Sequence, residues 1–334
     1  MKILDREIGN FVKPYIISEV SCNHDGDLGV ALTLIEAAKW AGADAVKFQA
    51  YTPDTLTLDC NKPDFIIQDG LWKGRTLYDL YKQTYTPFEW FPKIFKQAKK
   101  VGIPVFASVF DPTSIHALEK LDCPAYKIAS MEIVDTPLIS LAARTGKPLI
   151  VSTGMASDQE VLGAFDVVSR ERVAFLHCTS EYPQTVEWSS LRGIERLRKL
   201  LPDIPIGISD HTPGNLVVPV ASTAMGAAII EKHMKPEGVI TEDNEFSLTP
   251  EAFKSMTHLV NLTYEATLQR EFASNPTRQL RRSLYAVADI AKGETFTEAN
   301  IRSIRPGFGI LPKHLPKLLG RKASRAYRKG DRLS

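Results

Sequence analysis

Two histidines, His211 and His233, follow two short apolar runs and could bring both imidazoles to one site. The runs read IPIGIS and AAIIE, and the segment between them has the pattern of a helix. A strand, a helix and a second strand form the βαβ pattern of a parallel sheet. In a parallel barrel, the chain that follows each strand faces the carboxyl-end mouth, so both imidazoles would meet there. Imidazole nitrogens suit a divalent ion such as Mn²⁺, Fe²⁺ or Zn²⁺, although two unrelated histidines at loop starts remain an alternative.

Charged side chains also stand in and after the first two predicted strands. The run YIISEV (15–20) carries Glu19 and leads into a loop with Asn23, His24 and Asp25, a combination that indicates a site. The run DAVKFQA (44–50) places Lys47 and Gln49 on one side, because strand side chains alternate with period two. A lysine inside an apolar strand is costly unless it meets an anion; the alternative is an edge lysine that reaches water.

With the two histidine runs included, six further apolar runs follow the first two and alternate with helical patterns as far as about residue 265. Eight strand-helix units of this length predict a (β/α)8 barrel, the TIM-barrel class of α/β fold. Polar residues fall at the end of nearly every run. Polar residues of solvated loops would not keep such a constant position relative to the strands. These predicted mouth residues include Ser108, Lys127, Ser130, Glu132, Ser152, Ser180 and Tyr182.

Composition restricts the functional classes. The chain has 334 residues, 44% hydrophobic and 24% charged, with a net charge of +2, which is typical of a globular protein and gives no argument for nucleic-acid binding. The four cysteines form no CxxC pair, which disfavours a zinc-thiolate site and a disulfide scaffold. We expect a cytoplasmic protein that does not bind a membrane, because no run approaches the roughly 20 apolar residues of a membrane span.

Two segments stand apart from the barrel pattern. The stretch 51–87 is too long for a simple connection and is expected to cover substrate at the mouth. We place the barrel domain at 1–268, a polar linker at 269–280 and a small β-rich domain at 281–334. The small domain is basic, but no stacking aromatics are interleaved with the charge, so we expect it to lean on a barrel mouth rather than on nucleic acid.

Several motifs, taken in chain order, resemble the sialic acid synthase family, the phosphoenolpyruvate-condensing nonulosonate synthases. They are EVSCNHDG, DAVKFQ, PAYKIAS, STGM, HCTSEYP, GISDHT and EKH. The tail RRSLYAVADIAKGE…RSIRPGFG resembles that family's antifreeze-like (SAF) domain. The resemblance implies an enzyme that joins phosphoenolpyruvate to an acylamino-sugar with the help of a divalent cation, Mn²⁺, Co²⁺ or Mg²⁺.

The resemblance also implies roles for individual residues. Glu19, Lys127, His211 and His233 would be catalytic, and the two histidines would be the direct protein ligands of the metal. Arg305 would be the arginine that one subunit inserts into its partner's barrel, which implies a domain-swapped homodimer. The remaining implied substrate contacts are Asn23, Lys47, Gln49, Ser108, Ser130, Glu132, Ser152, Ser180, Tyr182 and Asp243.

Within the family, YTPDTLTLDC and LWKGRTLYDLYKQTYTPFEW look most like the pseudaminic acid synthases. Those enzymes use 2,4-diacetamido-2,4,6-trideoxy-L-altrose and release pseudaminate and phosphate. The segment TEDNEFSL keeps Asp243 but lacks the Gly-Pro that usually precedes it. Synthases of neuraminate or legionaminate are the nearest alternatives. A Schiff-base aldolase or lyase with Lys127 or Lys47 as nucleophile, and a non-catalytic sugar-binding barrel, are more distant ones.

Overall fold

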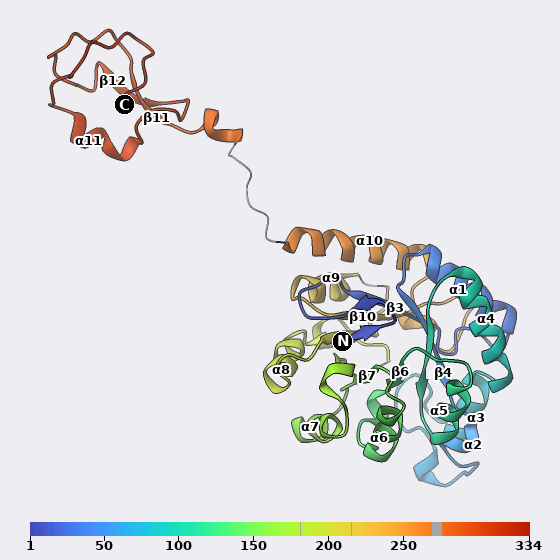
Figure 1. The fold of residues 1–334 in the computed structure, drawn as a ribbon. Helices are drawn as coiled ribbons and strands as arrows, with labels where there is room; N and C mark the ends of the chain where they lie inside the picture. Colours follow the sequence, from blue (N-terminus) through green and yellow to red (C-terminus); the bar gives the residue numbers. More distant parts are fainter. Residues whose placement is uncertain (181, 215, 269–275) are drawn as a thin grey trace. The chain divides into compact units, whose positions relative to one another are not determined.

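A closed barrel of parallel strands forms the larger part of the protein, as seen in a computed structural model (Figure 1). The structure describes residues 1–180, 182–214, 216–268 and 276–334. Within these ranges, eight strands pair in the order β10-β3-β4-β5-β6-β7-β8-β9. The strands are β3 (Tyr15–Glu19), β4 (Ala45–Ala50), β5 (Val105–Val109), β6 (Tyr126–Ile128), β7 (Leu149–Ser152), β8 (Val173–His177), β9 (Ile206–Asp210) and β10 (Ile229–His233). The predicted TIM barrel is confirmed.

Helices follow the strands and cover the barrel from outside (Figure 1). Side chains at the strand-to-helix turns cap several of them: Asp27 accepts from two backbone amides of α1, and Asp111 does the same for α5. Such caps satisfy amides that have no partner within the helix, so each helix begins close to the strand end. The helices are α1 (Leu28–Trp40), α4 (Phe91–Val101), α5 (Pro112–Glu119), α6 (Thr136–Arg144), α7 (Asp158–Asp166), α8 (Arg192–Leu200), α9 (Val217–Ala224) and α10 (Pro250–Thr267).

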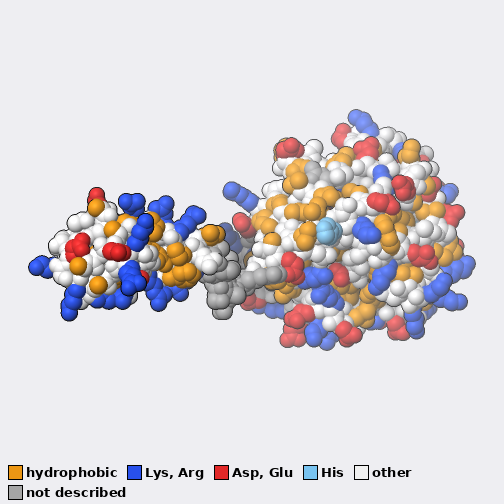
Figure 2. Space-filling view, turned by 90° about the horizontal axis from the view of Figure 1, so that it is seen from above, with side chains coloured by type: hydrophobic (Ala, Val, Ile, Leu, Met, Phe, Trp, Pro, Cys, Tyr) orange, Lys and Arg blue, Asp and Glu red, His pale blue; other side chains and the backbone are white. Residues whose placement is uncertain are grey.

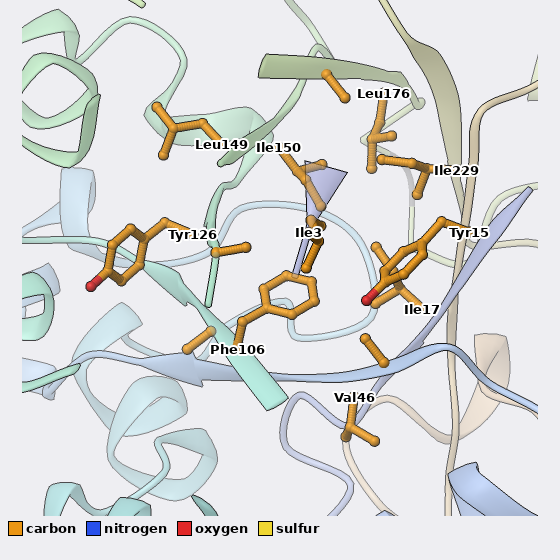
Figure 3. Packing of buried hydrophobic residues seen from close by; sticks show 14 of the residues in the cluster. Ile3, Tyr15, Ile17, Val46, Phe106, Tyr126, Leu149, Ile150, Leu176 and Ile229 are labelled. Atoms are coloured by element: carbon orange, nitrogen blue, oxygen red, sulfur yellow. The ribbon is translucent and has the colours of Figure 1, made fainter. Parts of the chain in front are cut away.

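The amino-terminal end of the barrel is filled by apolar side chains. The short strands β1 (Lys2–Ile3) and β2 (Arg6–Glu7) form a hairpin, and Ile3 is buried with the core. Figure 3 shows Ile3 among side chains of the barrel strands, beside Phe106 and Ile150. Because this end is packed with hydrocarbon, polar side chains on the inward face gather toward the carboxyl end.

The segment between β4 and α4 is an ordered insertion that contains α2 (Pro53–Leu56) and α3 (Leu77–Thr84). Between these helices, backbone hydrogen bonds from Ile67 to Arg75 and from Gly74 to Ile67 close a hairpin-like loop. Gly74 has a φ of +84°, a left-handed conformation that favours glycine at this turn. We call residues 66–76 the insertion loop.

The chain divides into two compact units, Met1–Leu268 and Gln269–Ser334. In the smaller unit, β11 (Ser283–Ala286) pairs with β12 (Ile301–Ile304), and α11 (Leu315–Leu318) follows. A separate small core holds this unit together, with Leu284, Phe296 and Tyr327 among its members. Figure 2 shows Lys and Arg side chains gathered over the small unit. The first part of the predicted linker, 269–275, lies outside the described residues.

Candidate active site

A pocket of about 350 Å³ opens at the carboxyl ends of the barrel strands. The strands bring together most of the residues that the sequence placed at the mouth. The insertion loop adds Trp72, and α3 adds Tyr81. Predicted site residues that line the pocket are Glu19, Lys47, Gln49, Ser108, Lys127, Ser130, Glu132, Ser152, Tyr182, His211, His233 and Asp243.

Two buried lysines form the centre of the pocket floor. The Lys47 ammonium lies 2.7 Å from a Glu19 carboxylate oxygen and donates to Ser108 Oγ at 2.9 Å. The Lys127 ammonium donates to Glu231 Oε1 at 3.0 Å, and Lys47 lies 3.7 Å from the same oxygen. All four ionisable groups are at most 4% exposed, so each charge depends on its partners rather than on water.

The electrostatics of the floor follow from this pairing. Burial lowers the pKa of Lys47, but Glu19 and Glu231 outweigh it and raise the pKa above its ordinary value. Lys127 differs, because burial lowers its pKa more than Glu231 raises it. Burial raises the pKa of Glu231, yet Lys127 and Lys47 together lower it to about 2. Glu231 therefore carries the negative charge that both ammonium groups face.

Glu231 was missed by the sequence reasoning, although a signal existed. It stands two residues before His233 on β10, so period-two alternation places both side chains on the inward face. Ser209 of β9, also unassigned from the sequence, donates to Glu231 Oε1 at 2.9 Å. The other oxygen, Oε2, is buried without a hydrogen-bond partner among the described residues.

The two predicted metal histidines lie side by side at the ends of β9 and β10. Their ring centroids are 5.3 Å apart, and Tyr182 packs 4.5 Å from the His211 ring. Burial lowers the pKa of His211 well below its usual value, and the nearby His233 and Lys232 add to this. His211 is therefore neutral at physiological pH, the form that binds a metal. Its Nδ1 is buried and has no hydrogen-bond partner among the described residues.

Asp243 stands behind His233, with Oδ2 3.2 Å from the ring Nδ1, an ion-pair distance without hydrogen-bond geometry. Burial raises the pKa of Asp243, but the contacts with His233, Ser21 and Cys22 together outweigh it and hold the pKa below its usual value. A carboxylate beside a ligating imidazole fixes the orientation of the ring. In the described ranges, no cluster of three or more His, Cys, Asp or Glu side chains is arranged to hold an ion. The two imidazoles fit a site whose remaining ligands come from substrate or water.

A further ion pair supports the histidines from outside the barrel interior. Lys232 donates to Asp210 Oδ2 at 2.8 Å and to the Thr212 carbonyl, and Asp210 accepts from the Thr212 amide. This fully buried pair links the ends of β9 and β10. His211 follows β9 directly, and His233 is the last residue of β10. The sequence reasoning did not assign the pair.

Buried hydroxyl and carboxyl oxygens without hydrogen-bond partners occur in and next to the pocket lining. Ser152 Oγ, Ser180 Oγ and Glu132 Oε2 accept or donate no hydrogen bond within the described part of the chain. Burial raises the pKa of Glu132 to about 7. Buried polar atoms are normally satisfied, so this concentration indicates a polar ligand that completes the pocket.

Three predicted substrate contacts lie outside the pocket lining. Asn23 is buried behind the pocket and donates to the Met234 carbonyl at 3.0 Å and to Ser247 Oγ at 2.9 Å, so it holds the loop after β10. Ser180 is close to Gly154, where an added Cβ would lie 2.3 Å from its hydroxyl. Arg305 is exposed in the small unit. His24, which the sequence also suggested, contacts Thr86 at 3.1 Å and does not line the pocket.

Known proteins with similar sequences or structures support this interpretation of the pocket. A model of the NeuB family matches residues 34–271, and a model of the SAF domain matches residues 281–334. The chain is 44% identical to a pseudaminic acid synthase of Campylobacter jejuni over 98% of both chains, and 40% identical to one of Helicobacter pylori over 96% of both. A crystal structure of N-acetylneuraminic acid (sialic acid) synthetase from Leptospira borgpetersenii is similar, with 27% identity and a TM-score of 0.73, covering 84% of this chain and 94% of that chain.

The protein is a parallel barrel with a lysine-rich floor and two histidines at one side of its mouth. The chain belongs to the NeuB family, which confirms the resemblance seen in its motifs. It is a phosphoenolpyruvate-dependent nonulosonic acid synthase, and the family implies phosphoenolpyruvate and an amino-sugar as substrates. Synthases of this family typically use a divalent metal. No helix in the described ranges is long and apolar enough to cross a membrane.

Proposed function

We propose that this enzyme is a pseudaminic acid synthase that condenses phosphoenolpyruvate with 2,4-diacetamido-2,4,6-trideoxy-L-altrose. One observation carries the proposal: a floor of two lysines and several serine hydroxyls shares a pocket with an apolar wall. Leu56, Ile67, Trp72, Leu77 and Leu80 of the 51–87 insertion form that wall. A 6-deoxy sugar with two acetamido groups presents methyl groups to such a wall, whereas N-acetylmannosamine presents a hydroxyl at C6. The high identity to two pseudaminic acid synthases supports the same choice.

Phosphoenolpyruvate brings a phosphate and a carboxylate, and the pocket floor suits both. Lys47 and Lys127 supply charge, while Ser108, Ser130 and Ser152 supply hydroxyl donors. Glu19 and Glu231 keep the lysines paired before the anion arrives. On binding, substrate oxygens would take up donors that the protein leaves unused, since charge-assisted hydrogen bonds are the strongest kind available here.

The reaction forms one carbon–carbon bond and breaks one carbon–oxygen bond. C3 of phosphoenolpyruvate bonds to the aldehyde carbon of the open-chain sugar, and the aldehyde oxygen takes a proton. Water adds at C2, and the C2–O bond to phosphate breaks, which releases inorganic phosphate. Glu19, at the floor beside Gln49, would orient this water or remove its proton. Glu132 and Tyr182 would contact the sugar.

His211 and His233 would hold the divalent cation, Mn²⁺, Co²⁺ or Mg²⁺, with Asp243 fixing the His233 ring. When bound, the ion would act as a Lewis acid toward the sugar aldehyde. We further propose that residues 269–280 link the barrel to the SAF domain and that two cytoplasmic chains exchange these domains. Arg305 of one chain would then complete the partner's site by binding an acyl group of the sugar.

A sugar panel tests the substrate. The enzyme is incubated with phosphoenolpyruvate and, separately, with the 6-deoxy diacetamido altrose, N-acetylmannosamine and the legionaminate precursor. Phosphate release and product mass are recorded. The expected result is the highest kcat/KM for the altrose derivative. A preference for N-acetylmannosamine would move the enzyme to the neuraminate branch, and a preference for the third sugar to the legionaminate branch.

A further inference from the structure

Glu242, on the loop after β10, holds the insertion loop in place. One carboxylate oxygen accepts from the Trp72 indole at 3.0 Å, and the other accepts from the Arg75 guanidinium at 2.7 Å. The bond between Trp72 and Glu242 spans 170 positions of the sequence, and the bond between Arg75 and Glu242 spans 167. Arg75 also donates to the Gln83 side chain at 2.6 Å, which ties the same loop to α3.

The position of Trp72 matters for the pocket. Its ring lies 6.2 Å from the Tyr182 ring, which in turn lies 4.5 Å from His211. Trp72 lines the pocket as part of the apolar wall. The loop around it is closed by backbone hydrogen bonds between Ile67 and Arg75, and Glu242 is its charged anchor to the barrel.

Glu242 and Asp243 are neighbours with different partners. Asp243 contacts His233 at the pocket, whereas Glu242 contacts the insertion loop. Thr241, the residue before them, donates to the Asn23 side chain behind the pocket. The loop after β10 is thus fixed at three successive residues, and a rigid support is what an anchoring carboxylate needs.

We propose that Glu242 is a positioning residue for sugar selection. It holds Trp72 as a wall against the apolar groups of the acylamino-sugar and leaves the phosphoenolpyruvate floor untouched. The sugar part of this inference rests on the proposed function. The lysine floor contacts neither Glu242 nor Arg75, so loss of the anchor should affect one substrate and spare the other.

The first measurement needs no substrate. Amide hydrogen exchange of peptides covering 66–76 is compared in the wild type, Glu242→Ala and Asp69→Asn. Asp69 is a matched control, because it is an exposed carboxylate of the same loop whose one ion pair among the described residues is with Lys73, at 3.8 Å. Exchange should accelerate at least about tenfold in Glu242→Ala alone, since local opening follows loss of the contacts that close it. Equal exchange in all three proteins would overturn the anchor.

The second measurement is a split of kinetic constants. Glu242→Ala should raise KM for the preferred sugar roughly tenfold, the size of one lost apolar contact, with KM for phosphoenolpyruvate unchanged. Glu242→Gln keeps an acceptor for the Trp72 indole and should lie in between. Faster exchange with an unchanged sugar KM, or an equal rise in both KM values, would overturn sugar selection. A wild type that turns over no tested sugar would refute the proposed function, while the exchange measurement would still decide the anchor.

Discussion

Lys127 Nζ and Glu231 Oε1 lie 3.0 Å apart, although their strands, β6 and β10, stand on opposite sides of the barrel. Both side chains are almost completely buried. A buried lysine that waits for an anionic substrate needs a counter-charge in the meantime. Glu231 provides it for Lys127 and, at 3.7 Å, for Lys47. The substrate and this carboxylate therefore act on the same two ammonium groups.

Replacing Glu231 by glutamine should destabilise the free enzyme and increase its response to anions. Loss of one partner of a buried ion pair costs about 3–5 kcal/mol of unfolding free energy. Phosphoenolpyruvate should then stabilise the variant more than the wild type, because its charge replaces the missing carboxylate. Denaturation with and without phosphoenolpyruvate measures both effects. Asp158→Asn, which breaks an exposed pair with Arg196, should cost at most about 1 kcal/mol. An equal gain from phosphoenolpyruvate in variant and wild type would contradict the prediction.

Two substitutions should lower the affinity of the metal site by different amounts. Asp243→Asn leaves both imidazoles in place but removes the charge that orients His233, so Mn²⁺ affinity should fall roughly 10–100-fold. His233→Ala removes a ligand and should reduce affinity further and abolish turnover. Equilibrium dialysis with Mn²⁺ reads affinity independently of activity. His258→Ala, an exposed histidine of α10, is the control. Full activity in excess chelator would argue against any metal role.

Stability should depend on pH through Glu132. Burial raises its pKa to about 7, so the folded state favours the protonated carboxyl. This contribution is fully present below about pH 4.5 and is lost as pH rises through 7. Relative to Glu132→Gln, the wild type should lose roughly 1–3 kcal/mol of unfolding free energy between pH 5 and 8. Urea denaturation across this range, with Glu195→Gln as the exposed control, measures it. A constant difference between wild type and Glu132→Gln would disprove the shift.

Arg305 should act in the partner's site. A chain that ends after Gln279 should retain a folded barrel that binds metal and phosphoenolpyruvate, because those groups lie in the compact unit Met1–Leu268. Turnover of this truncated chain should fall roughly ten- to a hundredfold, because it lacks Arg305 and the loss of a charge-assisted hydrogen bond costs about 1.5–3 kcal/mol.

Mixing subunits tests the exchange directly. His233→Ala and Arg305→Ala are each expected to impair turnover, but a hybrid dimer contains one site with both residues intact. Activity should therefore partly return on mixing. If mass spectrometry shows hybrid dimers and activity does not rise, the arginine acts within its own chain or has no role.

The phase of each strand was predictable from the sequence, and with it most of the pocket. Lys47 and Gln49 share a face because side chains alternate, and the closed barrel turns every such face toward one axis. Partners across the barrel were not predictable in this way. Whether Lys127 meets Glu231 depends on the stagger between strands, which no single strand encodes. Glu231 was overlooked although it stands two residues before His233 and therefore shares its face of β10.

The insertion shows a second limit. Its length indicated a cover for the mouth, but the contact of Trp72 with Glu242 joins two loops that share no periodic pattern. Asn23 shows a third. Its position after a strand indicated a site, yet its amide is used by the backbone of Met234 and by Ser247. Amides serve structure and recognition equally well, and only the neighbours decide which.

The pairing of β3 with β10, the seam that closes the barrel, has a consequence for how the enzyme folds during its synthesis. Glu19 of β3 and His233 of β10 are direct neighbours across that seam, and Asn23 reaches Met234 from 211 positions away. During translation, the first strand must therefore wait, unpaired on one side, until the last strand leaves the ribosome. Chaperones and proteases meet an open sheet edge during this interval. Catalytic competence should arise in a single late step, so products of synthesis that end before β10 cannot carry partial activity.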